Sequence, residues 1–79
     1  MDSLADDLIR LREALLPQAR DAAAIGAIAS AEIAAKAGDP SRVNQALSAL
    51  GTAGKWVFGV AKDIGVQIAV ETLKKTIGM

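Results

Sequence analysis

The chain has 79 residues and zero formal net charge, with nine basic and nine acidic side chains. It holds 17 alanines and seven glycines but no histidine, cysteine or tyrosine, so the usual groups for proton transfer, thiol chemistry and soft-metal binding are missing. Zero net charge also argues against nucleic-acid binding, which requires a basic face. We therefore expect a single helical domain over residues 1–79 that is not an enzyme and has no cofactor or metal.

Hydrophobic residues make up 52% of the chain, which excludes intrinsic disorder as the default. A core of this size supplies only about 3–5 kcal/mol of net stability, so association with another chain is the expected additional source. The acidic start is unlike a signal peptide, and no apolar run reaches the length of a transmembrane helix. The absence of cysteine is typical of a cytoplasmic protein.

Apolar residues at helical spacing begin the chain, where Asp2 or Ser3 can cap a first helix. A leucine row follows: Leu4, Leu8, Leu11 and Leu15. Pro17 removes a backbone donor and disfavours helical geometry at the residue before it. The same line nevertheless continues through residues 22, 26, 29 and 33. We therefore expect one long kinked helix over 3–37, with a real turn at 16–20 as the alternative.

The segment Gly38-Asp39-Pro40 is the clearest break in the sequence. Glycine suits the left-handed position after a helix, aspartate suits an N-cap, and proline suits the first turn. A short helix over 40–50 should follow and end in a turn at 51–54. The last helix is expected over 53–77, with Gly78 as its stop. The predicted fold is all-α with three to four helices, its long N-terminal helix packed antiparallel on its long C-terminal helix.

The last predicted helix has apolar residues on two opposite sides. The first stripe is wider than a surface helix needs and comprises Val57, Phe58, Val60, Ala61, Ile64, Gly65 and Ile68, with Trp56 at its edge. The second stripe comprises Val66, Val70, Leu73 and Ile77. A helix that buries opposite faces at its two ends must meet different partners there. One short chain has few elements for that role, so the pattern predicts self-association.

Small residues recur every four positions in both predicted long helices. One row is Ala22, Gly26, Ser30 and Ala34, and another is Ala61, Gly65 and Ala69. Such rows let helix backbones approach closely, so we expect the two long helices to pack at short range. A bend or a close approach explains Gly59 equally well.

Three segments carry a family resemblance: AAKAGDPSRV at 34–43, GKWV at 54–57 and AKDIGV at 61–66. Together they resemble the small alanine-rich helical modules appended to effector domains in bacterial signalling and antiphage-conflict proteins. The resemblance covers residues 8–77 and implies a homotypic or adaptor interaction rather than an activity. It transfers no functional residue, and this chain departs from the pattern by starting at its own Met1.

The predicted function is a non-enzymatic helical interaction module that self-associates, as a bundle oligomer or a filament, or serves as an adaptor. The candidate contact residues are Trp56, Val57, Val60, Ala61, Ile64, Gly65, Val66, Ile68 and Val70. Trp56 has a second interpretation, as a core residue at the corner between the middle and last helices. The alternative function is a membrane-active protein, because residues 55–77 combine aromatic, aliphatic and lysine side chains as interfacial helices do. Expected partners are a second copy, another protein or a membrane surface, and not nucleic acid.

Overall fold

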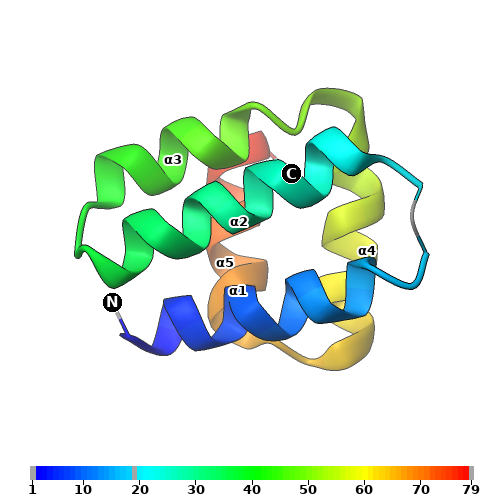
Figure 1. Cartoon of the computed structure of the whole chain (residues 1–79), viewed down its shortest axis with the longest axis horizontal. Coiled ribbons are helices and arrows are strands. Elements are labelled where there is room, and N and C mark those ends of the chain that lie inside the picture. The colour runs from blue at the N-terminus through cyan, green and yellow to red at the C-terminus, as the bar shows by residue number, and fades with distance from the viewer. Residues whose placement is uncertain (1, 19, 79) are drawn as a thin grey trace.

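The computed structural model describes residues 2–18 and 20–78, and within them it is helical, with no strand. Five α-helices and one 3-10 helix follow in chain order: α1 (Asp2–Leu15), α2 (Ala22–Lys36), α3 (Pro40–Ser48), η1 (Gly51–Ala53), α4 (Gly54–Ile64) and α5 (Gln67–Ile77). In Figure 1 the first three helices run across the view and α4 and α5 cross behind them. The all-α class is confirmed, whereas the predicted count of three to four helices is wrong.

The long kinked N-terminal helix is also wrong, because the segment folds back into two helices. α1 and α2 lie side by side in opposite directions (Figure 1). Pro17 lies just after α1, and the Asp21 carboxylate caps α2 by accepting a hydrogen bond from the Ala24 amide at 3.1 Å. The alternative, a turn at 16–20, describes this reversal better, although Ala19 lies outside the described residues.

Local signals placed α3 correctly. Gly38 has a φ of 71°, and the Asp39 carboxylate accepts a hydrogen bond from the Arg42 amide at 3.1 Å, with Pro40 as the first helical residue. Gly78 ends α5 at a φ of 74°. These positions were predicted because each depends on a few neighbouring residues and on no distant contact.

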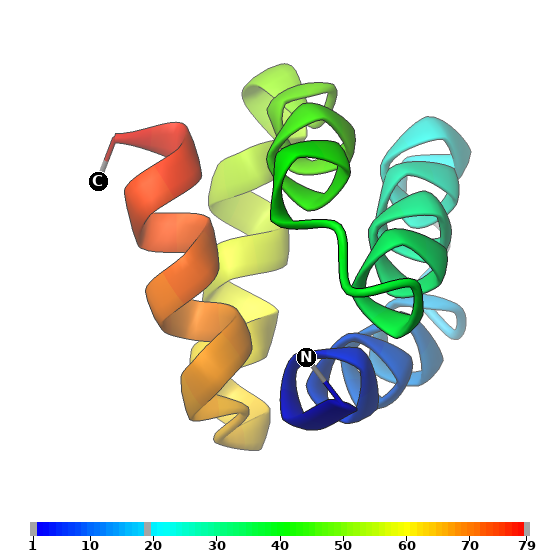
Figure 2. The ribbon, with the colours of Figure 1, turned by 90° about the vertical axis from the view of Figure 1, so that its left-hand side faces the viewer.

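The predicted last helix is likewise two helices, broken at Gly65. This residue takes a φ of 74°, and the next amide, that of Val66, donates to the Ala61 carbonyl at 3.2 Å. The Gly65 amide donates to Lys62 at 3.2 Å, so α4 ends in a Schellman motif. α5 then runs back beside α4 (Figure 2).

The reversal at Gly65 accounts for the two opposed apolar stripes. On one straight helix they would face apart, but after the chain turns back both contribute to the same core. Val57 and Ala61 of the first stripe and Val66 and Leu73 of the second are all fully buried. The opposed stripes therefore do not require a second chain in this fold.

The leucine row of α1 forms the centre of the core, and α1 contacts α2, α4 and α5. Leu4, Leu8, Leu11 and Leu15 are all buried. The alanine-rich α2 packs mainly on α1 and α3, so the predicted close packing of small-residue rows between N- and C-terminal helices is not found. A Cβ added at Gly26 or Gly65 would meet nothing within 4 Å. Close approach occurs instead at Gly54, where an added Cβ would lie 3.4 Å from Ile77.

Candidate functional site: the outer face of α2

The nine predicted contact residues do not form one surface. Four are buried in the chain's own core: Val57, Val60, Ala61 and Val66. Three are half-buried: Trp56, Ile64 and Val70. Gly65 and Ile68 are exposed, with Ile68 at 44%. A partner could meet most of this set only after α4 and α5 had separated.

Trp56 packs at the edge of the core, between the start of α4 and the loop that joins α1 to α2. Its indole N–H donates to the Gln18 Oε1 at 2.8 Å, and the Arg20 guanidinium lies 5.6 Å from the ring centroid. Both contacts come from the loop, so the corner that Trp56 fills involves that loop. The hydrogen bond satisfies the polar end of a largely apolar side chain, as expected for a tryptophan at this depth.

Charge is nearly absent from α2. Its only charged side chains are Glu32 and Lys36. Glu32 is 8% exposed, and its carboxylate binds the Arg12 Nε at 2.9 Å and the Lys36 Nζ at 3.4 Å. The carboxylate therefore ties α2 to α1, and the Lys36 side chain, 56% exposed, lies at the edge of the solvent side of the helix.

The solvent side of α2 otherwise carries small and apolar residues. We define the α2 outer face as one strip of exposed or half-buried residues on this side, bordered by Lys36: Ala22, Gly26, Ala29, Ser30, Ile33 and the C-cap residue Ala37. Ile33 is 68% exposed, against 50% for Leu16 and 44% for Ile68, the other exposed large hydrophobic residues among those described. A groove of about 370 Å³ adjoins the face on the side of α3, between Ile33 and Arg42.

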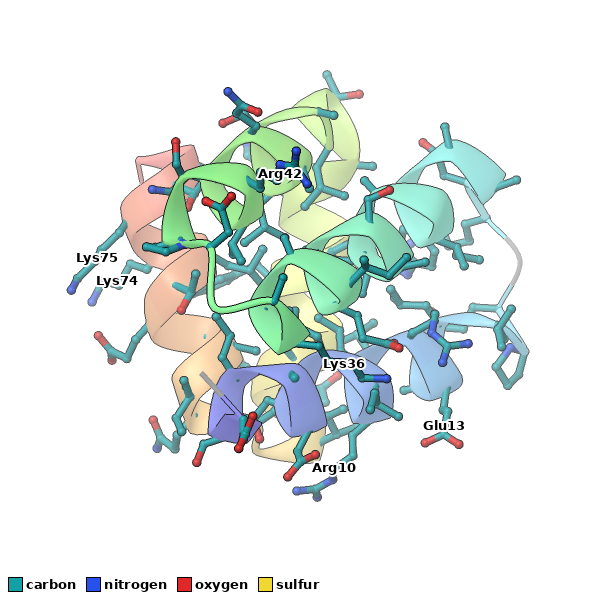
Figure 3. All side chains as sticks on the ribbon, turned by 60° about the vertical axis from the view of Figure 1, so that its left-hand side comes forward. Arg10, Glu13, Lys36, Arg42, Lys74 and Lys75 are labelled. Carbon is teal, nitrogen blue, oxygen red and sulfur yellow. The ribbon has the colours of Figure 1, made fainter. Side chains whose placement is uncertain are left out.

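The rest of the surface is more charged. Figure 3 shows Arg10 and Glu13 pointing into solvent from α1, and Lys74 and Lys75 doing so from the end of α5. Lys36 lies between α2 and α1 in the same view, in keeping with its pairing to Glu32. The α2 outer face is therefore set apart by both its lack of charge and its exposed isoleucine.

A second hollow, of about 330 Å³, lies between α3 and α5 and is lined by polar side chains. Its hydroxyl groups already donate hydrogen bonds within the chain: Ser48 to the Asn44 carbonyl, Thr72 to the Ile68 carbonyl, and Thr76 to the Asn44 Oδ1. Lys75 contributes the one charged group of the lining. The arrangement offers no pair of groups suited to nucleophilic or acid–base chemistry.

Across residues 2–18 and 20–78, no group of three or more metal-ligating side chains comes together. Within the same residues, every buried side-chain nitrogen or oxygen has a hydrogen-bond partner. None of the described helices combines the length and the apolar character needed to cross a bilayer.

Sequence reasoning missed Ile33 although the signal was present. Residues 22, 26, 29 and 33 were interpreted as a continuation of the leucine row along one helix. The reversal after α1 turns α2 over, so this line faces solvent while the alanines behind it face α1 and α3. The near absence of charged residues in 22–36 was the better indication that the solvent side of this helix is apolar.

Comparison of the chain with protein-family models, with curated protein sequences and with solved structures gives no match. The resemblance to bacterial helical modules therefore stays a prediction.

Proposed function

We propose that the protein is a non-enzymatic helical interaction module that self-associates through the α2 outer face. The observation that carries the proposal is the position of Ile33, 68% exposed within a face of small, uncharged residues. A helix that is apolar nearly all round is normally buried on all sides. Exposed apolar patches on small proteins commonly mark contact sites.

The lack of charge favours a second copy as the partner. A two-fold dimer brings the same face of both chains together, so any charge on it would oppose its own equivalent. The α2 outer face has none, and its glycine, alanines and serine let two helices approach closely. Ile33 of one copy would then fill the space above Gly26 of the partner subunit, where an added Cβ meets nothing within 4 Å in the single chain.

The test is the mass in solution of wild-type protein and an Ile33→Lys variant, by light scattering at micromolar concentrations. Removing a buried isoleucine from each half of a dimer costs about 2 kcal/mol or more, so the dissociation constant should rise at least about 30-fold. Leu16→Lys is the matched control, since Leu16 is also exposed but lies off the α2 outer face. A folded wild-type monomer throughout this range would contradict the proposal.

The alternative function, membrane binding, is tested by a second measurement, co-sedimentation with vesicles. The apolar side of α5 is occupied by its own core, with Leu73 fully buried, so binding a bilayer through α5 would first require α5 to detach. Co-sedimentation with anionic vesicles that is lost at high salt and on Lys74→Glu/Lys75→Glu substitution would replace the self-association proposal. Absence of vesicle binding together with dimer formation would support the self-association proposal.

A further inference from the structure

The link between α4 and α5 is unusually short. Only Gly65 and Val66 separate the two helices, and Gly65 alone has a positive φ. If these two residues became helical, residues 54–77 would form one rod about 36 Å long. Short hinges between packed helices are where chains exchange elements with one another.

In such a rod the two halves cannot share one core. The buried side chains of α4, such as Val57, would lie opposite those of α5, such as Leu73, because the intervening residues advance by 100° each. The reversal at Gly65 is what brings both sets into one core. In a straight rod, the α4 half stays packed in the core of its own chain, and the apolar side of the α5 half must be buried against another chain.

We propose that the chain exchanges α5 between two copies by straightening at Gly65 and Val66. The occupant of the place vacated by α5 is the α5 of a second copy, which fits because it has the same sequence. It would restore the burial of Leu73, the Thr76–Asn44 hydrogen bond and the packing of Ile77 on Gly54. This proposal does not rest on the α2 outer face.

The row Ala61, Gly65 and Ala69 supports the straight form. In the closed chain Gly65 has no packing role, since a Cβ added there meets nothing within 4 Å. In a straight rod the three small residues line up at the midpoint, where two rods related by a two-fold axis would cross closely. Ile68, exposed at 44% beside the hinge, would gain a partner at the same crossing.

Asp7 stabilises the closed form only. Its Oδ2 accepts hydrogen bonds from the amides of Ile68 at 3.0 Å and Ala69 at 3.2 Å, and so caps the start of α5 from α1. In a straight rod these amides bond to carbonyls four residues earlier, and the carboxylate loses its role. The cap thus sets the balance between closed monomer and exchanged dimer.

The first test compares Gly65→Ala with Gln67→Pro, both in the Ile33→Lys background, where the α2 outer face no longer holds two copies together. Alanine disfavours the left-handed conformation and favours helix. Together these two effects should shift the equilibrium from closed monomer to exchanged dimer by about 30-fold per hinge and about 1000-fold for a dimer with two hinges. Gly65→Ala should therefore be a dimer at micromolar concentration by light scattering. Proline fits the first position of α5, where it removes only the hydrogen bond that the Gln67 amide donates to the Gly65 carbonyl, but it does not fit inside a rod. In the Ile33→Lys background, Gln67→Pro should therefore stay monomeric and helical, even after refolding at high concentration.

The second test reports which chain supplies α5. The sequence has no cysteine, so an Asn44→Cys/Thr76→Cys pair places one thiol on α3 and one on α5 where the native side chains touch at 3.2 Å. Oxidised in the Gly65→Ala background, the pair should link two chains into a covalent dimer on a non-reducing gel. Dimers held through the α2 outer face would give only links within one chain, so the two proposals fail separately.

Asp7→Ala should also shift the balance toward the dimer, by about fivefold per cap and about 30-fold for a dimer with two caps, whereas Asp6→Ala on the exposed side of α1 should not. The proposal is overturned if Gly65→Ala is a folded monomer, or if its dimer forms cross-links only within each chain. It is equally overturned if Gln67→Pro dimerises as readily as Gly65→Ala.

Discussion

The α1–α2 and α4–α5 hairpins have similar sequence patterns but reverse direction for different reasons. The first is joined by residues 16–21, where Pro17 stops one helix and the Asp21 carboxylate caps the next. The second is joined by Gly65 and Val66, and α5 has no capping side chain of its own. Local chemistry therefore both ends α1 and starts α2. In the second hairpin it ends α4, through the Schellman motif at Gly65, whereas the start of α5 is capped from α1.

The side-chain contacts across the two hairpins differ in the same way. An ion pair between Arg12 and Glu32 joins α1 directly to α2 at 2.9 Å. The polar contacts of α5 come from outside its own hairpin, from Asp7 on α1 and Asn44 on α3. α1 thus serves both hairpins, through its leucine row and through Asp7.

The largest expected effect comes from truncating a core side chain of α1, the helix that contacts both hairpins. Leu8 is fully buried in α1, and Leu8→Ala should cost about 3 kcal/mol. A core this small supplies only about 3–5 kcal/mol, so both hairpins should lose their cooperative thermal transition together by circular dichroism. Leu16→Ala, at a half-exposed site, should cost less than about 1 kcal/mol. Survival of one hairpin alone would show that α1 does not couple them.

Breaking the ion pair between α1 and α2 should have a smaller effect than Leu8→Ala. Glu32→Gln leaves the partly exposed Arg12 without its carboxylate, and we expect a loss of about 1–2 kcal/mol in urea unfolding. Lys36→Gln removes only the exposed partner and should cost less than about 0.5 kcal/mol. A double-mutant cycle with Arg12→Gln measures the coupling; near-additive losses would mean that the ion pair contributes little.

The two capping aspartates allow a direct comparison of local and distant capping. Asp7→Ala and Asp21→Ala should each cost about 1 kcal/mol. Hydrogen exchange should rise along α5 in the first variant, because α5 loses its tie to α1, and only at the start of α2 in the second. Equal, local changes in both variants would contradict the distinction between the hairpins.

The smallest effects, and the only stabilising ones, are expected at two glycines within helices. A Cβ at Gly26 of α2 or at Gly59 of α4 meets nothing within 4 Å. Gly26→Ala and Gly59→Ala should each stabilise the monomer by about 0.5–1 kcal/mol through helix propensity. Loss of stability in either variant, measured by urea unfolding at low protein concentration, would mean that the glycine serves close packing.

Sequence alone predicted features that depend on near neighbours. Asp39 and Pro40 begin α3, and Gly38 and Gly78 end helices, because caps and left-handed glycines act within one turn. The reversal at Gly65 was missed, and the reversal after Leu15 was predicted only as the alternative, because the helical spacing of apolar residues is the same whether a helix continues or breaks. Gly65 illustrates this: it suits both a close-packed row and a Schellman turn, and only the burial of both stripes in one core decides between them.

The candidate site followed the same rule. Residues predicted as contacts on an unbroken helix, such as Val57 and Val66, are in the core once the helix folds back. Ile33, predicted to continue the leucine row, is exposed whereas that row is buried, for the same reason. Which side of α2 is outward depends on how the chain reverses after Leu15, and that reversal is a property of the whole fold.

The capping of α5 by Asp7 has a consequence for how the molecule is made and destroyed. Asp7 precedes the two amides that it binds by 61 and 62 residues, so on the ribosome the carboxylate emerges long before the helix end that needs it. α5 should therefore settle last, after α1 to α4 have been synthesised. Proteolytic loss of the first turns of α1 would, by the same link, loosen α5.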